Sequence, residues 1–310
     1  MFILDLPSDV FRIPMSHTYP PFKNGRYMEE FFYDFITKNI ETLVDINYVY
    51  IPVFWTNLQV NDDYGQKKTY YNNLLQTAYN NLPKDTKYFT IVQHDDCVQL
   101  NIPKNTLIFG ACSGHIPLPL IYEDINNTLS TLCNTYKINR KLLCSFYGST
   151  THPIRNMLQF FHREGVIEIN QKTWEKNINN SDASEFIQLA LQSVFTLSPR
   201  GYGRSSFRFF ESILLGSIPI YIYDDINWLP YQNIIDYSKF SIILHQNEIH
   251  RLPILLEELT SEKLVILQEE LHKHSNYFGL EYMCNYIKNT LETIKEIPQL
   301  YEGKSTLHII

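Results

Sequence analysis

The chain has 310 residues, of which 44% are hydrophobic, and its formal net charge at pH 7 is -7. That length suits one large or two medium-sized cores, and the acidic balance excludes any electrostatic argument for nucleic acid or an anionic membrane as a partner. The 5 cysteines include no C-x-x-C pair, which argues against a disulfide framework and a zinc site. We therefore expect buried thiols in a reducing compartment.

The N-terminus carries no secretory signal pattern. Met1–Leu4 is apolar, but Asp5, Pro7 and Asp9 interrupt the run at once, and the sequence contains no run long enough to span a membrane. We expect a soluble cytoplasmic protein, or a chain from which a membrane anchor has been removed.

The first half of the chain alternates between helical and extended patterns after an irregular lead-in. Helices are expected at 27–43 and 69–81, and buried strands at 48–54, 88–92 and 106–112. The polar segment 55–66 is expected to be a loop, and the proline-limited segment 116–122 is extended. Such alternation is typical of a parallel sheet with helices on both faces.

The second half begins after a polar, asparagine-rich stretch at 124–139, where we place the domain boundary. Strands are expected at 142–147, 166–169, 194–197, 218–223 and 240–244, and helices at 153–162, 182–192, 249–259, 262–274 and 280–297. Ser181 or Asp182 is a plausible N-cap for the helix at 182–192. The last helix is long enough to pack back across the first domain.

The most informative stretch runs from Phe195 to Asp225. A strand leads through the turn 198–204 into a helical pattern that stops at Gly216, and a second strand follows. This strand–loop–helix order places backbone N–H groups and the positive helix end against a phosphate. Three arginines lie in or beside the turn, and a glutamate follows in the helix: Arg200, Arg204, Arg208 and Glu211. The stretch therefore predicts a nucleotide-diphosphate site.

The same stretch resembles the signature of the exostosin-like glycosyltransferases. The matching positions are Pro199, Arg200, Gly201, Gly203, Ser206, Arg208, Glu211, Gly216, Ile218, Pro219 and Asp224. The resemblance implies a GT-B fold, in which two Rossmann-like domains face each other across a cleft and the second domain binds the nucleotide-sugar. The expected divisions are 1–138 for the acceptor-side domain, 139–285 for the donor domain and 286–310 for a helix that packs back on the first. Animal members usually carry a membrane anchor, and this sequence departs from that pattern.

For the donor site, we expect the planar guanidinium of Arg208 to bind phosphate oxygens, with Arg200 and Arg155 doing the same from the loop and a neighbouring helix. The resemblance implies that Glu211 accepts from ribose hydroxyls, and an i,i+3 ion pair with Arg208 is equally compatible. The full set of expected nucleotide-sugar residues is Arg155, Arg200, Gly201, Gly203, Arg204, Ser205, Ser206, Arg208, Glu211 and Asp224. The alternative is that these arginines simply pair with acidic side chains.

The sequence contains no Asp-x-Asp motif for a catalytic metal. Its adjacent aspartate pairs are 62–63, 95–96 and 224–225, and neighbouring side chains diverge on an extended backbone. Because arginines and a helix terminus can replace a metal's charge, we expect transfer without a metal or other cofactor.

The general base is expected at the end of a first-domain strand. Asp95 and Asp96 follow the strand at 88–92, and His94 is a rival. A carboxylate shielded from water has a raised pKa and is a better base. Asp62, Asp63 and Glu123 are the fallbacks.

The resulting prediction is an inverting transferase that moves a sugar from a UDP-sugar to a glycan or glycoconjugate hydroxyl; inversion and UDP come from the resemblance. A non-catalytic nucleotide-sugar or glycan-binding module is the alternative. A Rossmann-type oxidoreductase is a weaker competitor, because the sequence lacks GxGxxG after a first strand with a following acidic residue.

Overall fold

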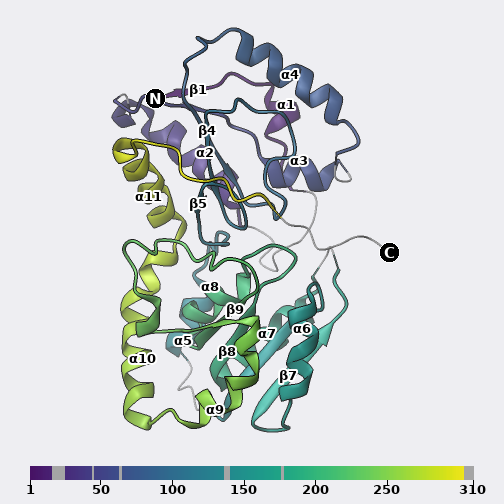
Figure 1. Ribbon diagram of the computed structural model, residues 1–310, viewed down its shortest axis with the longest axis vertical. Helices are drawn as coiled ribbons and strands as arrows, with labels where there is room; N and C mark the ends of the chain where they lie inside the picture. The colour runs from purple at the N-terminus through teal and green to yellow at the C-terminus, as the bar shows by residue number, and fades with distance from the viewer. Residues whose placement is uncertain (16–24, 44, 63–64, 136–139, 176–177, 304–310) are drawn as a thin grey trace. The chain divides into compact units, whose positions relative to one another are not determined.

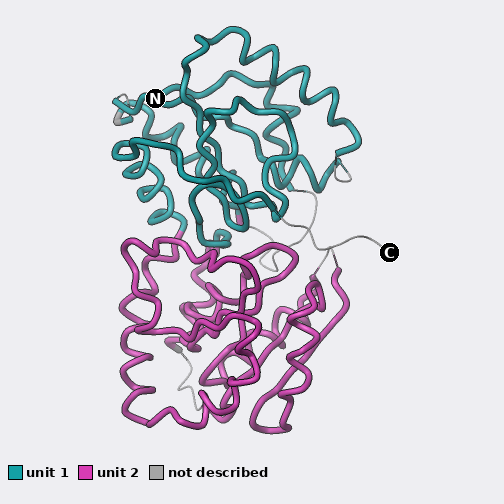
Figure 2. Tube along the Cα trace, viewed as in Figure 1, with its two compact units in different colours: residues 1–17, 26–123, 280–305 teal, residues 18–25, 124–279, 306–310 magenta. Residues whose placement is uncertain are grey.

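The computed structural model describes residues 1–15, 25–43, 45–62, 65–135, 140–175 and 178–303 (Figure 1). The chain forms two compact units (Figure 2). Among the described residues, unit 1 comprises those at 1–15, 26–123 and 280–303, and unit 2 comprises residue 25 and those at 124–279. Each unit has its own sheet and its own core.

Unit 1 is built on a five-stranded parallel sheet with the order β1-β2-β3-β4-β5. Its strands are β1 (Phe2–Ile3), β2 (Val49–Tyr50), β3 (Tyr88–Val92), β4 (Thr106–Gly110) and β5 (Ile116–Pro117). Its helices are α1 (Ser8–Phe11), α2 (Met28–Asn39), η1 (Ile40–Leu43), α3 (Trp55–Asn61), α4 (Lys68–Asn80) and α11 (Leu280–Thr293). Every residue of β3 and β4 is buried, so these strands form the centre of the unit.

Unit 2 also has a five-stranded parallel sheet, with the order β10-β9-β8-β6-β7. Its strands are β6 (Leu142–Ser149), β7 (Ile167–Lys172), β8 (Ser193–Pro199), β9 (Ile218–Tyr223) and β10 (Ile242–His245). Its helices are α5 (Thr128–Thr135), α6 (Pro153–Met157), η2 (Leu158–Phe161), α7 (Asn180–Gln192), α8 (Phe207–Leu214), η3 (Tyr237–Lys239), η4 (Gln246–Arg251), α9 (Leu252–Glu257), α10 (Ser261–His274) and η5 (Ser275–Phe278). The predicted α/β class with a parallel sheet in each of two domains is confirmed.

The strand order of unit 2 reverses beside β6. From β6 the chain moves to β7 on one side, and it then returns to place β8 on the other side. Later strands continue in that second direction through β9 to β10. In the part of unit 1 that the structure describes, by contrast, the strands follow the chain order without a reversal.

The unit boundaries differ from the predicted ones. The predicted boundary at 138/139 lies outside the described residues, and the units divide between Glu123 and Asp124 instead. The reason is that α5 packs on unit 2, where Leu129 is buried in a cluster with Phe186 and Leu215. The chain returns to unit 1 at Leu280, earlier than the predicted 286, because α11 is continuous from that residue and packs against α2.

Three local predictions were wrong. Segment 55–66, where a loop had been expected, contains helix α3, and the polar segment 124–139 contains helix α5. The N-cap of α7 is Asn179, whose side chain accepts from the backbone N–H of Asp182 at 2.8 Å. The strand expected at 48–54 is also shorter, because only Val49–Tyr50 pairs with its neighbours.

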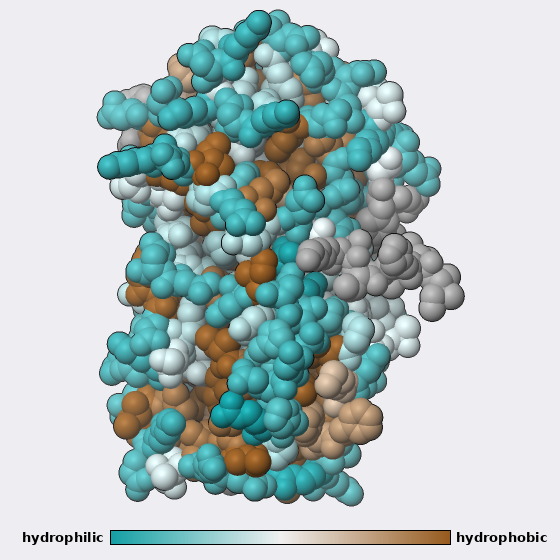
Figure 3. Space-filling view, viewed as in Figure 1, coloured by the Kyte–Doolittle hydropathy of each residue, from teal (hydrophilic) through white to brown (hydrophobic). Residues whose placement is uncertain are grey.

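The visible surface is mostly hydrophilic. On the face drawn in Figure 3, hydrophilic residues cover most of the area and hydrophobic residues form separate groups between them. None of the helices that the structure describes combines the length and the apolar character needed to cross a membrane.

Candidate functional site

The strand order of unit 2 indicates at which edge of its sheet a ligand is expected to bind. In open α/β sheets, ligands bind outside the carboxyl ends of the strands at the point where the strand order reverses. In unit 2 that point lies between β6 and β8. Residues 150–152 follow β6 and the loop 200–206 follows β8, so both segments flank this position. The predicted signature loop therefore lies where the fold itself favours a ligand.

The helix after the signature loop is fixed by its apolar side. Phe207, Phe210 and Ile213 are buried, and the helix ends where Gly216 adopts a positive φ of 68°. The N-cap residue Ser206 is extended and its side chain makes no capping hydrogen bond. The Ser206 side chain therefore does not cap the first turn of α8, and a helix start is a position at which backbone N–H groups bind anions.

Arg155 holds the two strand ends together. Its Nη1 donates to the carbonyl of Ser149 at 2.9 Å and its Nε donates to the carbonyl of Arg200 at 3.0 Å. Nη2 donates to the carbonyl of Pro199 at 3.3 Å. A Cβ on Gly201 would lie 2.9 Å from this Nη2, so glycine permits the close approach. Through these contacts, the guanidinium of Arg155 joins the end of β6 to the start of the signature loop and stabilises the conformation of that loop.

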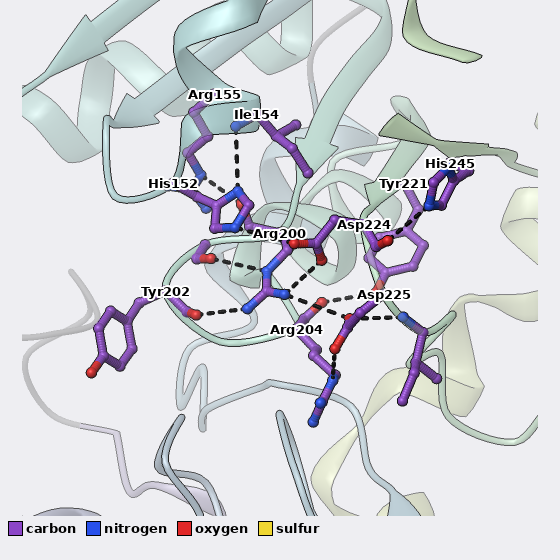
Figure 4. Close-up of polar contacts among 12 residues, drawn as sticks. His152, Ile154, Arg155, Arg200, Tyr202, Arg204, Tyr221, Asp224, Asp225 and His245 are labelled. Atoms are coloured by element: carbon purple, nitrogen blue, oxygen red, sulfur yellow. Dashed lines mark hydrogen bonds and ion pairs between the residues drawn. The ribbon is translucent and has the colours of Figure 1, made fainter. Parts of the chain in front are cut away.

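Arg200 is buried and binds the end of β9 (Figure 4). Its Nη1 lies 2.6 Å from Oδ1 of Asp224 and 3.5 Å from Oδ1 of Asp225. Its Nη2 donates to the carbonyl of Tyr202 at 2.8 Å, inside the loop. The two aspartates follow the last residue of β9 in a bend and not on an extended backbone, so the condition for divergent side chains is not met, and both carboxylates lie near the same guanidinium.

Two histidines complete the surroundings of Asp224 (Figure 4). Nδ1 of His152 accepts from the N–H of Ile154 at 3.3 Å, so its proton lies on Nε2, which is 3.3 Å from Oδ2 of Asp224. Nδ1 of His245 likewise accepts from the N–H of Asn247, and its Nε2 donates to the carbonyl of Asp224 at 2.7 Å. Burial acts to raise the pKa of Asp224, but the bonds from His152 and Arg200 hold that pKa well below its ordinary value.

The sequence did not reveal these histidines. His152 stands between a strand end and a proline at the first position of α6, and that local pattern was the only available signal. His245 closes β10 and caps η4, and nothing in its neighbourhood points to Asp224. His245 lies on β10, the strand next to β9, whereas His152 follows β6, which is separated from β9 by β8.

Arg204 is the second buried cation of the loop. Its Nε lies 2.8 Å from Oδ2 of Asp225, and its guanidinium lies over the ring of Trp228 at 5.8 Å. The hydroxyl of Tyr221 donates to the Arg204 carbonyl at 2.8 Å. Arg200 and Arg204 therefore connect the loop to the segment after β9 through the carboxylates of Asp224 and Asp225.

Arg208 is the most exposed of these three arginines. Its side chain is 17% exposed, against 2% for Arg200 and 4% for Arg204. Nε donates to the carbonyl of Tyr147 at 2.9 Å, and the guanidinium stacks on the ring of Phe186 at 3.8 Å. Nη1 pairs with the buried carboxylate of Glu211, as the i,i+3 spacing predicted.

The predicted acidic loop follows β3 in unit 1. The carboxylate of Glu29, buried at the start of α2, accepts from the N–H of Gln93 at 2.8 Å. His94 is buried and its Nδ1 accepts from the N–H of Asp96 at 3.1 Å. Burial lowers the pKa of His94 to about 4, so the ring is neutral at pH 7. Asp95 and Asp96 are partly exposed, and they are the carboxylates that this loop presents.

The fallback bases have other partners. Oδ2 of Asp62 accepts from the N–H of Lys67 at 2.8 Å, and Glu123 forms a two-point pair with Arg26. Asp63 lies outside the described residues. Among the residues that the structure describes, no group of three or more His, Cys, Asp or Glu side chains could hold a metal ion.

Comparison with known proteins finds a family match that lies mostly in the second half of the chain. Residues 114–259 match the Exostosin GT47 domain. Exostosin-1 of Drosophila melanogaster is 27% identical over 216 residues, which cover 62% of this chain and 28% of that protein. A probable glucuronosyltransferase of Oryza sativa subsp. japonica is 26% identical over 139 residues, covering 44% of this chain and 32% of its own length. The probable arabinosyltransferase ARAD1 of Arabidopsis thaliana is 34% identical over 92 residues, covering 29% and 20%.

Among solved structures, TarM matches this chain with a TM-score of 0.35 and 8% identity, covering 71% of this chain and 57% of that one. The pneumococcal O-GlcNAc transferase GtfA in complex with UDP and GlcNAc has a TM-score of 0.36 and 13% identity, covering 83% and 59%. This chain spans about a third or less of the length of the three curated relatives named above. The match over residues 114–259, together with these relatives, supports an exostosin-like glycosyltransferase family for this part of the chain.

Proposed function

We propose that this chain transfers a sugar from a UDP-sugar to a hydroxyl of a glycan or glycoconjugate, with inversion at the anomeric carbon and without a metal ion. The observation that carries the proposal is the Exostosin GT47 match at residues 114–259, which contains the whole β8–α8–β9 unit. The names of the relatives, glucuronosyltransferase and arabinosyltransferase among them, favour a hexosyl or pentosyl donor.

The donor half of the proposal assigns different roles to the arginines. Arg208 is the more exposed cation beside the start of α8, and its planar fork suits paired bonds to a diphosphate. We propose that Glu211, one turn further on, accepts from the ribose hydroxyls. Arg155 and Arg200 are bonded to backbone carbonyls and to Asp224, so we propose that they shape the loop around the diphosphate. Backbone and side-chain donors of 201–206 complete the site.

The reaction is a single displacement. A carboxylate, Asp95 or Asp96, takes the proton of the acceptor hydroxyl as its oxygen forms a bond to the anomeric carbon. The bond between that carbon and the diphosphate oxygen breaks on the opposite face, and UDP leaves with the electron pair. Arg208 and the start of α8 stabilise the negative charge that develops on the diphosphate, and this fixed positive charge takes the role of a metal.

The test is UDP release with a panel of UDP-sugars that includes UDP-glucuronic acid and UDP-arabinose, in the presence of a chelator. We expect Asp95→Asn or Asp96→Asn to lower kcat by about 10²- to 10⁴-fold while the affinity for UDP is retained. Asp85→Asn is the matched control, because Asp85 is exposed and precedes β3, at the opposite end of the strand. Nuclear magnetic resonance of the product reports the anomeric configuration.

Each outcome decides one part of the proposal. Loss of activity with chelator, restored by a divalent cation, would overturn metal independence. Retained configuration in the product would overturn the single displacement. Tight UDP binding with no turnover of any donor in the panel would favour a nucleotide-sugar-binding module over an enzyme.

A further inference from the structure

The segment after α11 crosses the carboxyl edge of the unit 1 sheet. We call residues 298–303 the C-terminal strap; in Figure 1 it lies within the yellow stretch that follows α11. Tyr301 and Gly114 exchange two backbone hydrogen bonds, each of 2.8 Å, and form an antiparallel bridge. Gly114 lies between β4 and β5. The strap is thereby attached next to the strand ends from which the acidic loop also emerges.

The end of the strap lies directly against that acidic loop. A Cβ placed on Gly303 would be 2.5 Å from Cα of Asp96 and 2.6 Å from the carbonyl oxygen of Asp95. Real Cβ atoms do not approach backbone atoms so closely, so any side chain at residue 303 must displace the loop or the strap. The backbone of Gly303 therefore packs directly against the backbone of the two proposed catalytic aspartates.

The acidic loop has a conformation that needs support. Cys97 is buried and has a positive φ of 64°, which is unfavourable for a residue with a side chain. The turn is closed by the bond from the Cys97 N–H to the His94 carbonyl at 3.2 Å and by the bond from the Asp96 N–H to the His94 ring. Such strained turns persist where the surrounding structure fixes them, and they are concentrated at functional sites.

We propose that the C-terminal strap belongs to the acceptor-side catalytic centre, and that Gly303 is a positioning residue that sets where the carboxylates of Asp95 and Asp96 lie. This inference rests on the proposed function, since it assumes that one of the two carboxylates is the base. It extends the proposed active centre to a segment that is separated from the acidic loop by most of the chain.

The experiment compares Gly303→Ala with Gly279→Ala in the full chain. Gly279 precedes the same helix, α11, and a Cβ there has its nearest neighbour at 3.9 Å, so it is a control with room for the methyl group. For Gly303→Ala we expect kcat to fall by about tenfold to a hundredfold, because a misplacement of about 1 Å costs that much. The dissociation constant for UDP stays unchanged, because UDP is proposed to bind unit 2.

A second readout does not require activity. Hydrogen exchange at the backbone amides of Asp96 and Cys97 should become faster in Gly303→Ala and stay as in the wild type in Gly279→Ala. Tyr301→Pro removes the N–H that donates to Gly114 without adding atoms beside Asp96, and it should produce the same change if Gly303→Ala fails to fold.

The outcomes separate this inference from the proposed function. Faster exchange at Asp96 and Cys97 in an enzyme with lowered kcat supports both. Unchanged exchange and unchanged kcat in Gly303→Ala overturn the positioning role and leave the proposed function standing. A wild-type protein that turns over no donor overturns the proposed function, and in that case the exchange data alone decide whether the strap fixes the loop.

Discussion

Nη1 of Arg200 lies 2.6 Å from Oδ1 of Asp224, and the Arg200 side chain is only 2% exposed. This pair joins the loop after β8 to the end of β9, the neighbouring strand. A buried ion pair contributes little net stability by itself, but removal of one partner leaves an uncompensated charge. The pair therefore fixes the shape of the loop more than it adds to the stability of the unit.

The first prediction concerns this pair. Arg200→Met and Asp224→Asn should each lower the free energy of unfolding by about 3–5 kcal/mol, because each removes the nearest counter-charge of its former partner. The double variant should cost less than the sum of the two single changes, and urea unfolding of all four proteins measures the difference. Additive effects would mean that the two side chains do not interact in solution.

The second prediction concerns Arg208. Arg208→Met should weaken UDP binding by about tenfold to a hundredfold, because the loss of one charge-assisted contact costs about 1.5–3 kcal/mol. Isothermal titration calorimetry measures the affinity, and the Tm shows whether the fold is retained. Arg251→Met is the matched control, since Arg251 is exposed and pairs only at the surface with Glu248 in the described contacts. Equal affinities for both variants would remove Arg208 from the diphosphate site.

The third prediction concerns pH. Burial lowers the pKa of His94 to about 4, against an ordinary value of 6.5. Between these values the unfolded chain binds a proton that the native protein does not, so stability is full above pH 6.5 and is lost as the pH falls towards 4. The loss should reach about 3 kcal/mol, and His94→Gln should flatten this part of the profile. Urea midpoints at pH 7 and pH 4.5 measure it, with His250→Gln as the control because His250 is exposed.

The fourth prediction concerns Arg140, which binds the ends of two helices. Its Nη1 donates to the carbonyl of Ala190, within the last turn of α7, at 3.0 Å and to the carbonyl of Ser193, directly after α7, at 2.6 Å. Its Nη2 donates to the carbonyl of Leu215, after α8, at 2.9 Å. Arg140→Met should lower the free energy of unfolding by about 2–4 kcal/mol, because buried carbonyls lose a charged donor.

The control for Arg140 is Arg163→Met. Arg163 forms a surface pair with Glu257, and both side chains are about half exposed, so its loss should cost less than about 1 kcal/mol. Thermal unfolding compares the two variants directly. Equal shifts in Tm would show that the helix-end contacts of Arg140 contribute no more than a surface ion pair does.

The β8–α8–β9 unit could be predicted because its signals are local. Apolar runs mark both strands, helical spacing marks α8, and Gly216 supplies the positive φ that ends it. Helix α3 could not be predicted in the same way. Its polar residues Thr56 and Asn57 are buried because their partners, Glu29 and Glu30, come from α2.

The site residues show the same contrast between local sequence signals and partners that are distant in the chain. Arg208 and Glu211 are one turn apart, so their pairing follows from sequence spacing. The partners of Asp224 are an arginine on the neighbouring strand's loop and a histidine that follows β6, and only the order of the sheet brings them together. The residue types were therefore predictable, but the partners of each arginine across the sheet were not.

The hydrogen bonds that Arg155 donates to the ends of β6 and β8 terminate on main-chain oxygens of Ser149, Pro199 and Arg200. A main-chain oxygen is present whatever amino acid occupies the position. These three hydrogen bonds therefore do not depend on which side chains stand at 149, 199 and 200, whereas they require the guanidinium at 155.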